Sequence, residues 1–168
     1  MKKSKFYLII IVLIFPIIGY SQVAISPYLS VGYMNHLTRN GINSELGVDF
    51  EIIKRINVST SFRYSLLDKG TENEIEVKAA SLFLSYVILN QKHHKLMIGP
   101  GISYGNYKRY TENIGGFEKE YKDYWFNPLK LRYDYIFSSK IKIGLDASLY
   151  GDDGDGGTYL GLVCGYVF

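Results

Sequence analysis

The sequence predicts an all-β fold, an eight-stranded antiparallel up-and-down β-barrel that crosses a membrane after a cleaved signal peptide. Three observations predict it. Eight segments alternate apolar and polar residues with period two, charged residues keep to one face of each segment, and short connections alternate with long ones. The chain of 168 residues suits a single domain, so we expect a signal peptide over residues 1–21 and one barrel domain over residues 22–168.

The N-terminal segment has the order of features found in secretory signal peptides. Three lysines within residues 1–5 precede an apolar run over residues 6–18, and the small residues Gly19 and Ser21 suit positions −3 and −1 of a cleavage site. The alternative is an uncleaved membrane anchor. The run is short for a span of about 20 residues, and Pro16 interrupts it. We therefore expect cleavage after Ser21 and export.

Removing the signal peptide changes the charge balance of the chain. Three of the 19 basic residues leave with it, so 16 remain against 16 acidic residues. A neutral mature chain gives no reason to expect a nucleic-acid partner. Cys164 is the single cysteine, so neither an intramolecular disulfide nor a metal cluster built on thiolates is possible.

Period-two alternation indicates strands with two unlike faces. In chain order the alternating segments span 26–33, 45–52, 58–66, 81–88, 96–105, 129–137, 141–149 and 159–168. The alternation is clear near the C-terminus, where Ile141, Ile143 and Leu145 share one face while Lys142 and Asp146 share the other. Beyond the signal peptide, no apolar run is long enough for a transmembrane helix.

The connections between these segments support a barrel with both chain ends in the periplasm. Three are short, at 55–57, 90–95 and 138–140, and four are longer and polar, at 35–43, 69–76, 108–124 and 151–157. Bacterial outer-membrane barrels have short periplasmic turns and longer extracellular loops. We therefore expect the four longer connections outside the cell.

Charge decides which face of each strand is enclosed. Nine charged residues lie on the polar faces: Glu45, Asp49, Glu51, Arg63, Lys130, Arg132, Asp134, Lys142 and Asp146. A soluble barrel would bury its apolar face instead, but an eight-stranded interior is too narrow for bulky side chains from every strand. A Lys or Arg facing lipid would cost about 2–4 kcal/mol at the midplane. We therefore expect the apolar faces in lipid and these charges in the lumen.

Charges enclosed in a narrow lumen are expected to pair, because an unpaired buried charge is costly. The predicted closed plug of salt bridges is built around Glu45, Asp49, Glu51, Arg63, Arg132 and Lys142. Aromatic residues near the strand ends are typical of interfacial girdles. We expect a periplasmic girdle of Tyr135, Phe137, Tyr166 and Phe168, and an outer one of Tyr33, Tyr104, Tyr107 and Trp125.

The C-terminus carries the most specific motif. Its alternating apolar residues are Leu160, Leu162, Cys164, Tyr166 and Phe168. They resemble the C-terminal insertion signal that the barrel-assembly machinery reads. With the segments 99–105 and 165–168, the mature chain resembles the small outer-membrane β-barrel domain family of Bacteroidota, akin to the OmpX type and the OmpA transmembrane domain. The resemblance implies a Gram-negative outer membrane, with lipid and lipopolysaccharide as surroundings, and no common catalytic residues or cofactors.

A lipid-modifying enzyme is one alternative function. Lipid A deacylases of the small-barrel kind use a His-x-Ser-Asn pattern near the outer rim. Here His36 is followed by Thr38 at the serine position, Asn40 comes too late, and nothing indicates that Ser44 and Glu45 converge on a base-activated nucleophile. We interpret His36 as an exposed loop residue and expect no catalytic site.

Two further segments resemble parts of metal sites. His93 and His94 are adjacent in a predicted turn, and without a third ligand we expect a solvated turn. In the glycine-rich segment 151–157, Asp153 and Asp155 resemble the start of a calcium loop whose later ligands are missing. We expect neither a metal site nor a cofactor, and interpret 151–157 as a flexible acidic hairpin tip, with calcium left open.

The connection 108–124 interleaves aromatic residues with charges of both signs. It is either a partner-binding hairpin or a strand extension above the membrane that its charges solvate. The expected function is a structural or surface-interaction barrel without enzymatic activity, with an extracellular partner bound through 108–124. A lipid-modifying enzyme and a narrow, porin-like pore are the alternatives.

Overall fold

The computed structural model describes residues 23–36, 39–69, 74–111, 117–152 and 155–168. The predicted signal peptide lies outside these residues. Within them, no helix is long and apolar enough to cross a membrane. The fold is all-β, as the sequence predicts.

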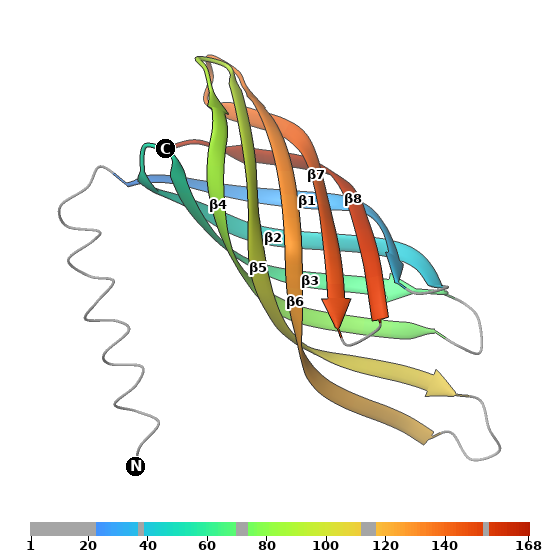
Figure 1. The fold of residues 1–168 in the computed structure, drawn as a ribbon. Coiled ribbons are helices and arrows are strands. Elements are labelled where there is room, and N and C mark those ends of the chain that lie inside the picture. The colour runs from blue at the N-terminus through green and yellow to red at the C-terminus, as the bar shows by residue number, and fades with distance from the viewer. Residues whose placement is uncertain (1–22, 37–38, 70–73, 112–116, 153–154) are drawn as a thin grey trace, which may run out of the picture.

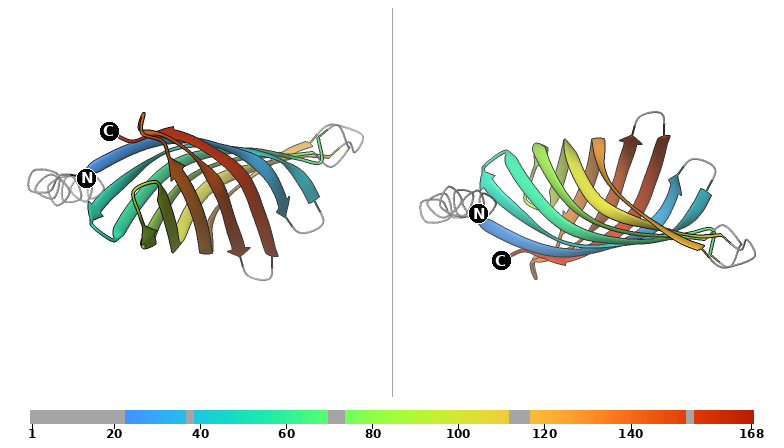
Figure 2. Two further views of the ribbon diagram at one scale, coloured as in Figure 1. Left: turned by 90° about the horizontal axis from the view of Figure 1, so that it is seen from above. Right: turned by 90° about the horizontal axis from the view of Figure 1, so that it is seen from below.

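Eight antiparallel strands form one closed barrel in which each strand pairs with the next along the chain (Figures 1 and 2). They are β1 (Ala24–His36), β2 (Arg39–Ile53), β3 (Ile56–Leu67), β4 (Ile75–Asn90), β5 (His94–Thr111), β6 (Phe117–Ile136), β7 (Ile141–Asp152) and β8 (Asp155–Tyr166). β1 also pairs with β8, from Tyr28 opposite Gly165 to His36 opposite Gly157. Around the closed part of the barrel, this pairing leaves no strand edge exposed, unlike in an open sheet.

The two ends of the barrel differ. Ala24 and the C-terminus lie at one end, here called the terminal end, together with the turns β2–β3, β4–β5 and β6–β7 (Figure 1). These turns are short, and the one between β6 and β7 places Lys140 in the left-handed region at φ 65°. At the opposite end, here called the hairpin end, β5 and β6 continue beyond the other strands (Figure 1).

Three of the connections predicted to be long are mostly strand. His36 of β1 pairs with Arg39, Thr111 of β5 pairs with Phe117, and Asp152 of β7 pairs with Asp155. In the described residues, the long connections expected at 35–43 and 108–124 are therefore too long, although strand extension was the second interpretation of 108–124. The segment 151–157 was interpreted as a hairpin tip, and its described residues pair as one. The backbone ladder continues where the apolar–polar alternation of the sequence ends, so the pattern gave no signal for these parts of the strands.

Burial follows the predicted alternation of faces. β4 alternates between buried and exposed side chains from Val77 to Ile88. Large apolar residues such as Leu162, which is 69% exposed, point outward, whereas the buried polar residues, among them nine serines and eight charged residues, point into the lumen. The outer faces are therefore apolar and the buried charges are enclosed, the arrangement of a barrel in lipid.

Inward glycines make room for aromatic rings in the lumen. A Cβ at Gly47 would collide with the Tyr28 ring, and one at Gly101 would collide with the Phe83 ring. Both are cross-strand neighbours in the register of the sheet. A ring lying over the glycine of the neighbouring strand fills the narrow interior without displacing the backbone.

Candidate functional site

Four acidic and four basic side chains meet inside the barrel. They are Glu45 and Asp49 of β2, Arg63 of β3, Lys130, Arg132 and Asp134 of β6, and Lys142 and Asp146 of β7. All eight are buried. Because β2 and β6 are four strands apart in a ring of eight, they form opposite walls, and the ion pairs between them cross the lumen.

Arg132 connects both walls of the lumen. Its Nη1 donates to Asp49 Oδ1 and Oδ2 at 3.1 and 2.9 Å, and its Nη2 donates to Asp146 Oδ2 at 3.0 Å. The guanidinium carbon lies 3.8 Å from the centre of the Tyr28 ring, a distance typical of a cation–π contact. Asp49 also accepts a hydrogen bond from Lys142 Nζ at 2.7 Å.

Glu45 is the second centre of the network. Its Oε1 accepts from Lys130 Nζ at 2.7 Å and from the Tyr28 hydroxyl at 2.7 Å, and its Oε2 accepts from Arg63 Nη2 at 3.2 Å. Lys130 Nζ also lies 4.3 Å from the centre of the Phe83 ring. Charges and rings together fill this level of the lumen, and each of the eight charged side chains has an oppositely charged partner, as a buried ionic network requires. Four buried atoms of the network, Arg63 Nε, Arg132 Nε, Asp134 Oδ1 and Asp146 Oδ1, have no hydrogen-bond partner among the described residues.

One member of the predicted plug pairs outside the network. Glu51 accepts a hydrogen bond from Lys95 Nζ at 2.7 Å near the terminal end, and among the described residues it makes no ion pair with the bases of that network. Its position two residues beyond Asp49 on the inner face predicted a shared network, but that spacing also moves it about 7 Å along the strand. Lys95 was missed because it falls next to a turn, where alternation gives no face.

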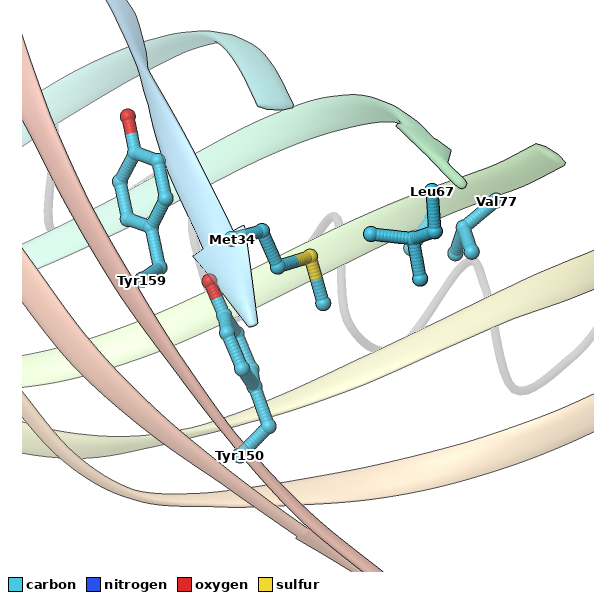
Figure 3. Close-up of a cluster of buried hydrophobic side chains, with 6 residues drawn as sticks. Met34, Leu67, Val77, Tyr150 and Tyr159 are labelled. Atoms are coloured by element: carbon cyan, nitrogen blue, oxygen red, sulfur yellow. The ribbon is translucent and has the colours of Figure 1, made fainter. Parts of the chain in front are cut away.

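Towards the hairpin end the lumen is apolar (Figure 3). The cluster there consists of Met34, Leu67, Val77, Ala79, Tyr150 and Tyr159. Figure 3 shows Met34 between the two tyrosine rings and the pair Leu67 and Val77. The Arg63 guanidinium lies 4.3 Å from the centre of the Tyr150 ring and joins the cluster to the charged level below.

The sequence did not predict this apolar cluster. Leu67 breaks the apolar–polar pattern of the sequence, because it is an apolar residue that points inward directly after the outward, apolar Leu66. Met34 and Val77 lie outside the segments whose alternation was clear. A sequence signal for the cluster does exist: at one end of several strands, the residues on the inner face are apolar and not polar. The lumen therefore has an apolar level at its hairpin end and a charged level beneath.

Aromatic and apolar side chains surround the outside of the terminal end. The Tyr135 and Phe137 rings meet edge-to-face with centroids 4.9 Å apart, and those of Tyr166 and Phe168 do so at 5.0 Å. All five residues of the predicted insertion signal, Leu160, Leu162, Cys164, Tyr166 and Phe168, are exposed on the outer face. Tyr33 and Tyr104 are exposed nearer the hairpin end, whereas the side chains of Tyr107 and Trp125 lie outside the described part.

The β5–β6 hairpin has an unpaired edge. Within the described residues, the ladder between β6 and β7 begins with Phe126 opposite Gly151. In this part of the chain, residues 117–125 of β6 pair with β5 on one side and have no strand on the other. At about 3.3 Å per residue, this edge is about 30 Å long. It presents free backbone donors and acceptors beyond the closed part of the barrel.

Solved structures of similar fold identify the type of barrel. No family model matches the chain, and no curated protein matches it in sequence. Neisserial surface protein A matches with a TM-score of 0.69 and 10% identity, over 88% of this chain and 98% of that one. The chain has the fold of a small outer-membrane β-barrel.

Other outer-membrane barrels match over similar lengths. Ail of Yersinia pestis, solved in complex with the heparin analogue sucrose octasulfate, has a TM-score of 0.60 and 17% identity over 87% of this chain and 97% of that one. The outer membrane enzyme PagL has a TM-score of 0.53 and 14% identity over 84% and 98%. These identities support the shared fold and no more, because one barrel fold hosts several functions.

Of the residues considered for an enzyme, Ser44 and Glu45 do not converge in this barrel. Glu45 points into the lumen and is bound by two bases. Its neighbour Ser44 is on the other face, where its hydroxyl donates to the Tyr64 carbonyl at 3.4 Å. Asn40 accepts a hydrogen bond from Asn35 Nδ2 across the β1–β2 hairpin at 2.6 Å. The side chain of His36 lies outside the described part.

The two histidines are not the solvated turn that the sequence predicted. Both are half-buried, and His94 is the first residue of β5. His94 Nδ1 lies 2.7 Å from the Tyr133 hydroxyl, and His93 Nδ1 lies 2.8 Å from the Ile136 carbonyl oxygen. The β4–β5 turn folds against the end of β6, where His93 stacks on Tyr135. They therefore extend the aromatic girdle.

The acidic segment 151–157 forms a hairpin. Gly151 pairs with Gly156 and Asp152 with Asp155, while residues 153–154 lie outside the described residues. Across the residues that the structure describes, no group of three or more His, Cys, Asp or Glu side chains is arranged to hold a metal ion. Calcium binding by this hairpin stays untested.

Proposed function

We propose that the chain is an outer-membrane β-barrel that displays the β5–β6 hairpin to a partner outside a Gram-negative cell. The apolar outer face and the fold of the solved relatives support a location in the outer membrane. The resemblance to small Bacteroidota barrels supports export by the signal peptide and assembly through the C-terminal residues. Outer-membrane lipid and lipopolysaccharide then surround the barrel, and the terminal end faces the periplasm.

The unpaired edge of β6 is the observation that carries this proposal. Residues 117–125 offer free backbone groups over about 30 Å, at the height where β7 has already ended. An extended segment of a partner can add to such an edge as a further strand. The alternating charges Glu118, Lys119, Glu120 and Lys122 discourage edge-to-edge pairing between copies, as charged residues do on natural edge strands.

The filled lumen supports display over transport. Ion pairs join opposite walls at the charged level, and the apolar cluster lies between that level and the hairpin end. A solute crossing the barrel would have to displace both. The barrel then serves as an anchor for the hairpin. This role requires no catalytic residues and no cofactor.

The test shortens the hairpin without breaking its register. Tyr107 and Tyr121 are paired, so residues 108–120 can be replaced by Asn-Gly, which suits a two-residue β-hairpin turn. Cells displaying the intact barrel are expected to adhere to at least one member of a panel of immobilised host proteins and sulfated glycans. Cells displaying the shortened barrel at equal surface density are expected to lose that adhesion.

A side-chain variant serves as the matched control. Replacing Tyr110, Phe117 and Tyr121 with Thr keeps the length and the backbone edge while removing the aromatic rings. Retained adhesion assigns binding to the backbone edge, and lost adhesion assigns it to the rings. Adhesion equal to that of cells without the barrel, or unchanged after shortening, would contradict the proposal.

The enzyme alternative has a direct test. PagL is an outer membrane enzyme of similar fold, but this chain departs from the His-x-Ser-Asn pattern at Thr38. Overexpression of the wild-type chain and of His36→Ala is expected to give identical lipid A mass spectra. A lipid A species present only with the wild-type chain would establish enzymatic activity and overturn this part of the proposal.

A further inference from the structure

A polar cavity of about 200 Å³ opens between the strand ends at the terminal end of the barrel. Its lining includes Asp49 and Glu51 of β2, Asn57 of β3, Lys95 of β5, Asp134 of β6 and Lys142 of β7. We call it the vestibule. The chain ends line it as well, through Ala24 and Val167. It lies on the opposite side of the charged level from the hairpin, so it is independent of the proposed surface function.

Most of the charged groups around the vestibule already have partners. Lys95 Nζ donates to Glu51 at 2.7 Å, and Lys142 Nζ donates to Asp49 at 2.7 Å. Asp134 is held more loosely: its Oδ2 forms an ion pair with Lys142 Nζ at 3.7 Å, which is beyond hydrogen-bond distance. Three carboxylates and two ammonium groups line the space. The carboxylate of Asp134 has no side-chain donor within hydrogen-bond distance among the described residues.

Two buried acceptor atoms of the lining have no hydrogen-bond partner among the described residues. They are Asp134 Oδ1 and Asn57 Oδ1, and both residues are almost fully buried. The orientation of the Asn57 amide follows from its neighbours. Ser59 Oγ donates to Asp49 at 2.6 Å and must therefore accept from Asn57 Nδ2 at 2.9 Å, which leaves Asn57 Oδ1 without a donor.

A ligand for this space must supply donors. A buried acceptor left unsatisfied costs about 1–3 kcal/mol, and here one of the two is a carboxylate oxygen. A water molecule occupies about 30 Å³ of liquid, so the vestibule has room for a group of several heavy atoms. In the part of the chain that the structure describes, no set of three carboxylate, histidine or cysteine ligands could hold a metal ion.

We propose that the vestibule binds a primary alkylammonium group that enters from the terminal end. Its N–H donors pair with Asp134 Oδ1 and Asn57 Oδ1, and its charge supplements that of Lys142, which contacts the Asp134 carboxylate only at 3.7 Å. Its short alkyl stem fits beside Ile136 and Val167 in the lining. The group belongs either to a small free amine or to a lysine side chain of a periplasmic polypeptide.

The experiment measures amine binding to the full mature barrel reconstituted in lipid nanodiscs. 1,4-Diaminobutane and Nα-acetyl-lysine amide, which keeps its ε-ammonium group, are titrated by calorimetry. Asp134→Asn keeps the shape of the side chain and removes its charge, so it is expected to weaken binding about tenfold, which corresponds to about 1.4 kcal/mol. Asn57→Asp adds a charge at the second acceptor and is expected to tighten binding by a similar factor.

The matched control is Asn127→Asp. Asn127 is also fully buried in the lumen with an unpartnered Oδ1, but it does not line the vestibule. It receives the same substitution as Asn57 and is expected to leave the amine affinity unchanged. The shift of gel mobility on heating verifies that each variant is folded. If Asp134→Asn does not fold, the comparison of Asn57→Asp with Asn127→Asp still decides.

The outcomes divide cleanly. Saturable binding that Asn57→Asp strengthens and Asn127→Asp leaves alone supports the site, and the tighter of the two ligands identifies the source of the amine. Absence of heat with both amines, for the wild type and for Asn57→Asp, would show that the vestibule holds water only. Equal affinity in all variants, or displacement of the amine by equimolar sodium, would overturn the assignment as well.

Discussion

Removing Arg132 from the lumen should destabilise the barrel more than removing Arg63. Arg132→Met deletes three hydrogen bonds to two buried carboxylates, Asp49 and Asp146. Neither acid becomes fully unpaired. Asp49 keeps its ion pair with Lys142 at 2.7 Å, and Asp146 keeps its ion pair with Lys130 at 3.1 Å. Breaking a buried ion pair costs about 3–5 kcal/mol, and these remaining contacts place the expected loss near the lower limit, about 3 kcal/mol.

Arg63→Met removes a single hydrogen bond of 3.2 Å. Its acceptor Glu45 keeps Lys130 and the Tyr28 hydroxyl, both at 2.7 Å. A hydrogen bond to a charged group contributes about 1.5–3 kcal/mol, and the loss should lie near the lower limit, about 1.5 kcal/mol. The two substitutions are chemically identical and each also removes one cation–π contact, with Tyr28 or with Tyr150, so the difference between them mainly reflects the number of carboxylates that each guanidinium serves.

The free energies of unfolding are measured by urea titration of the barrel in lipid vesicles, followed by tryptophan fluorescence and by gel mobility. Refolding from urea verifies that the transition is reversible. An equal loss of unfolding free energy in the two variants, or a larger loss for Arg63→Met, would refute the reasoning. The number of hydrogen bonds that each guanidinium makes to buried carboxylates would then not determine the stability of the barrel. An unfolded Arg132→Met with a folded Arg63→Met would agree with the expected order.

Three further predictions concern the packing, the orientation and the permeability of the barrel. Gly161→Ala should destabilise it by about 1–3 kcal/mol, because the new Cβ collides with the Tyr159 hydroxyl and ring, whereas Gly151→Ala meets no atom within 4 Å and should be neutral by the same urea titration. In vesicles, Cys164 should react with a lipid-soluble maleimide and resist a charged, membrane-impermeant one, since it is exposed on the outer face; equal labelling by both would contradict this. Planar-bilayer recordings of the wild-type protein should show no large, stable conductance, because ion pairs join opposite walls of the lumen, and steady open channels would count against a closed plug.

Alternation predicts the faces of the strands because period two is a property of every extended chain with unlike sides. Lys142 and Asp146, two periods of the alternation apart, could be placed inside from sequence alone, and the structure has both buried. Which charges meet is a different matter. The pair Arg132 and Asp49 is separated by 83 residues, and its geometry depends on the stagger between strands, which composition does not encode.

The limits of the strands were predicted poorly for a physical reason. Along the ends of β5 and β6 the apolar–polar alternation of the sequence stops, although the backbone ladder continues to Thr111 and Phe117. The described parts of the segment interpreted as a loop, residues 108–111 and 117–124, are therefore strand. The apolar cluster was missed for the opposite reason: Leu67 and Val77 are apolar on the enclosed face, where the pattern of the membrane region leads one to expect polar side chains.

The stacking of levels inside the barrel separates its two ends functionally. A partner added to the edge of β6 and an ammonium group in the vestibule would be divided by the apolar cluster and by the salt bridges of Glu45 and Asp49. Coupling between the ends would require an element with two arrangements that both ligands bias, yet the network between them is closely packed and its charges are balanced. Binding at one end should therefore leave affinity at the other unchanged. A change in amine affinity on hairpin shortening would mean that the charged level rearranges as a unit.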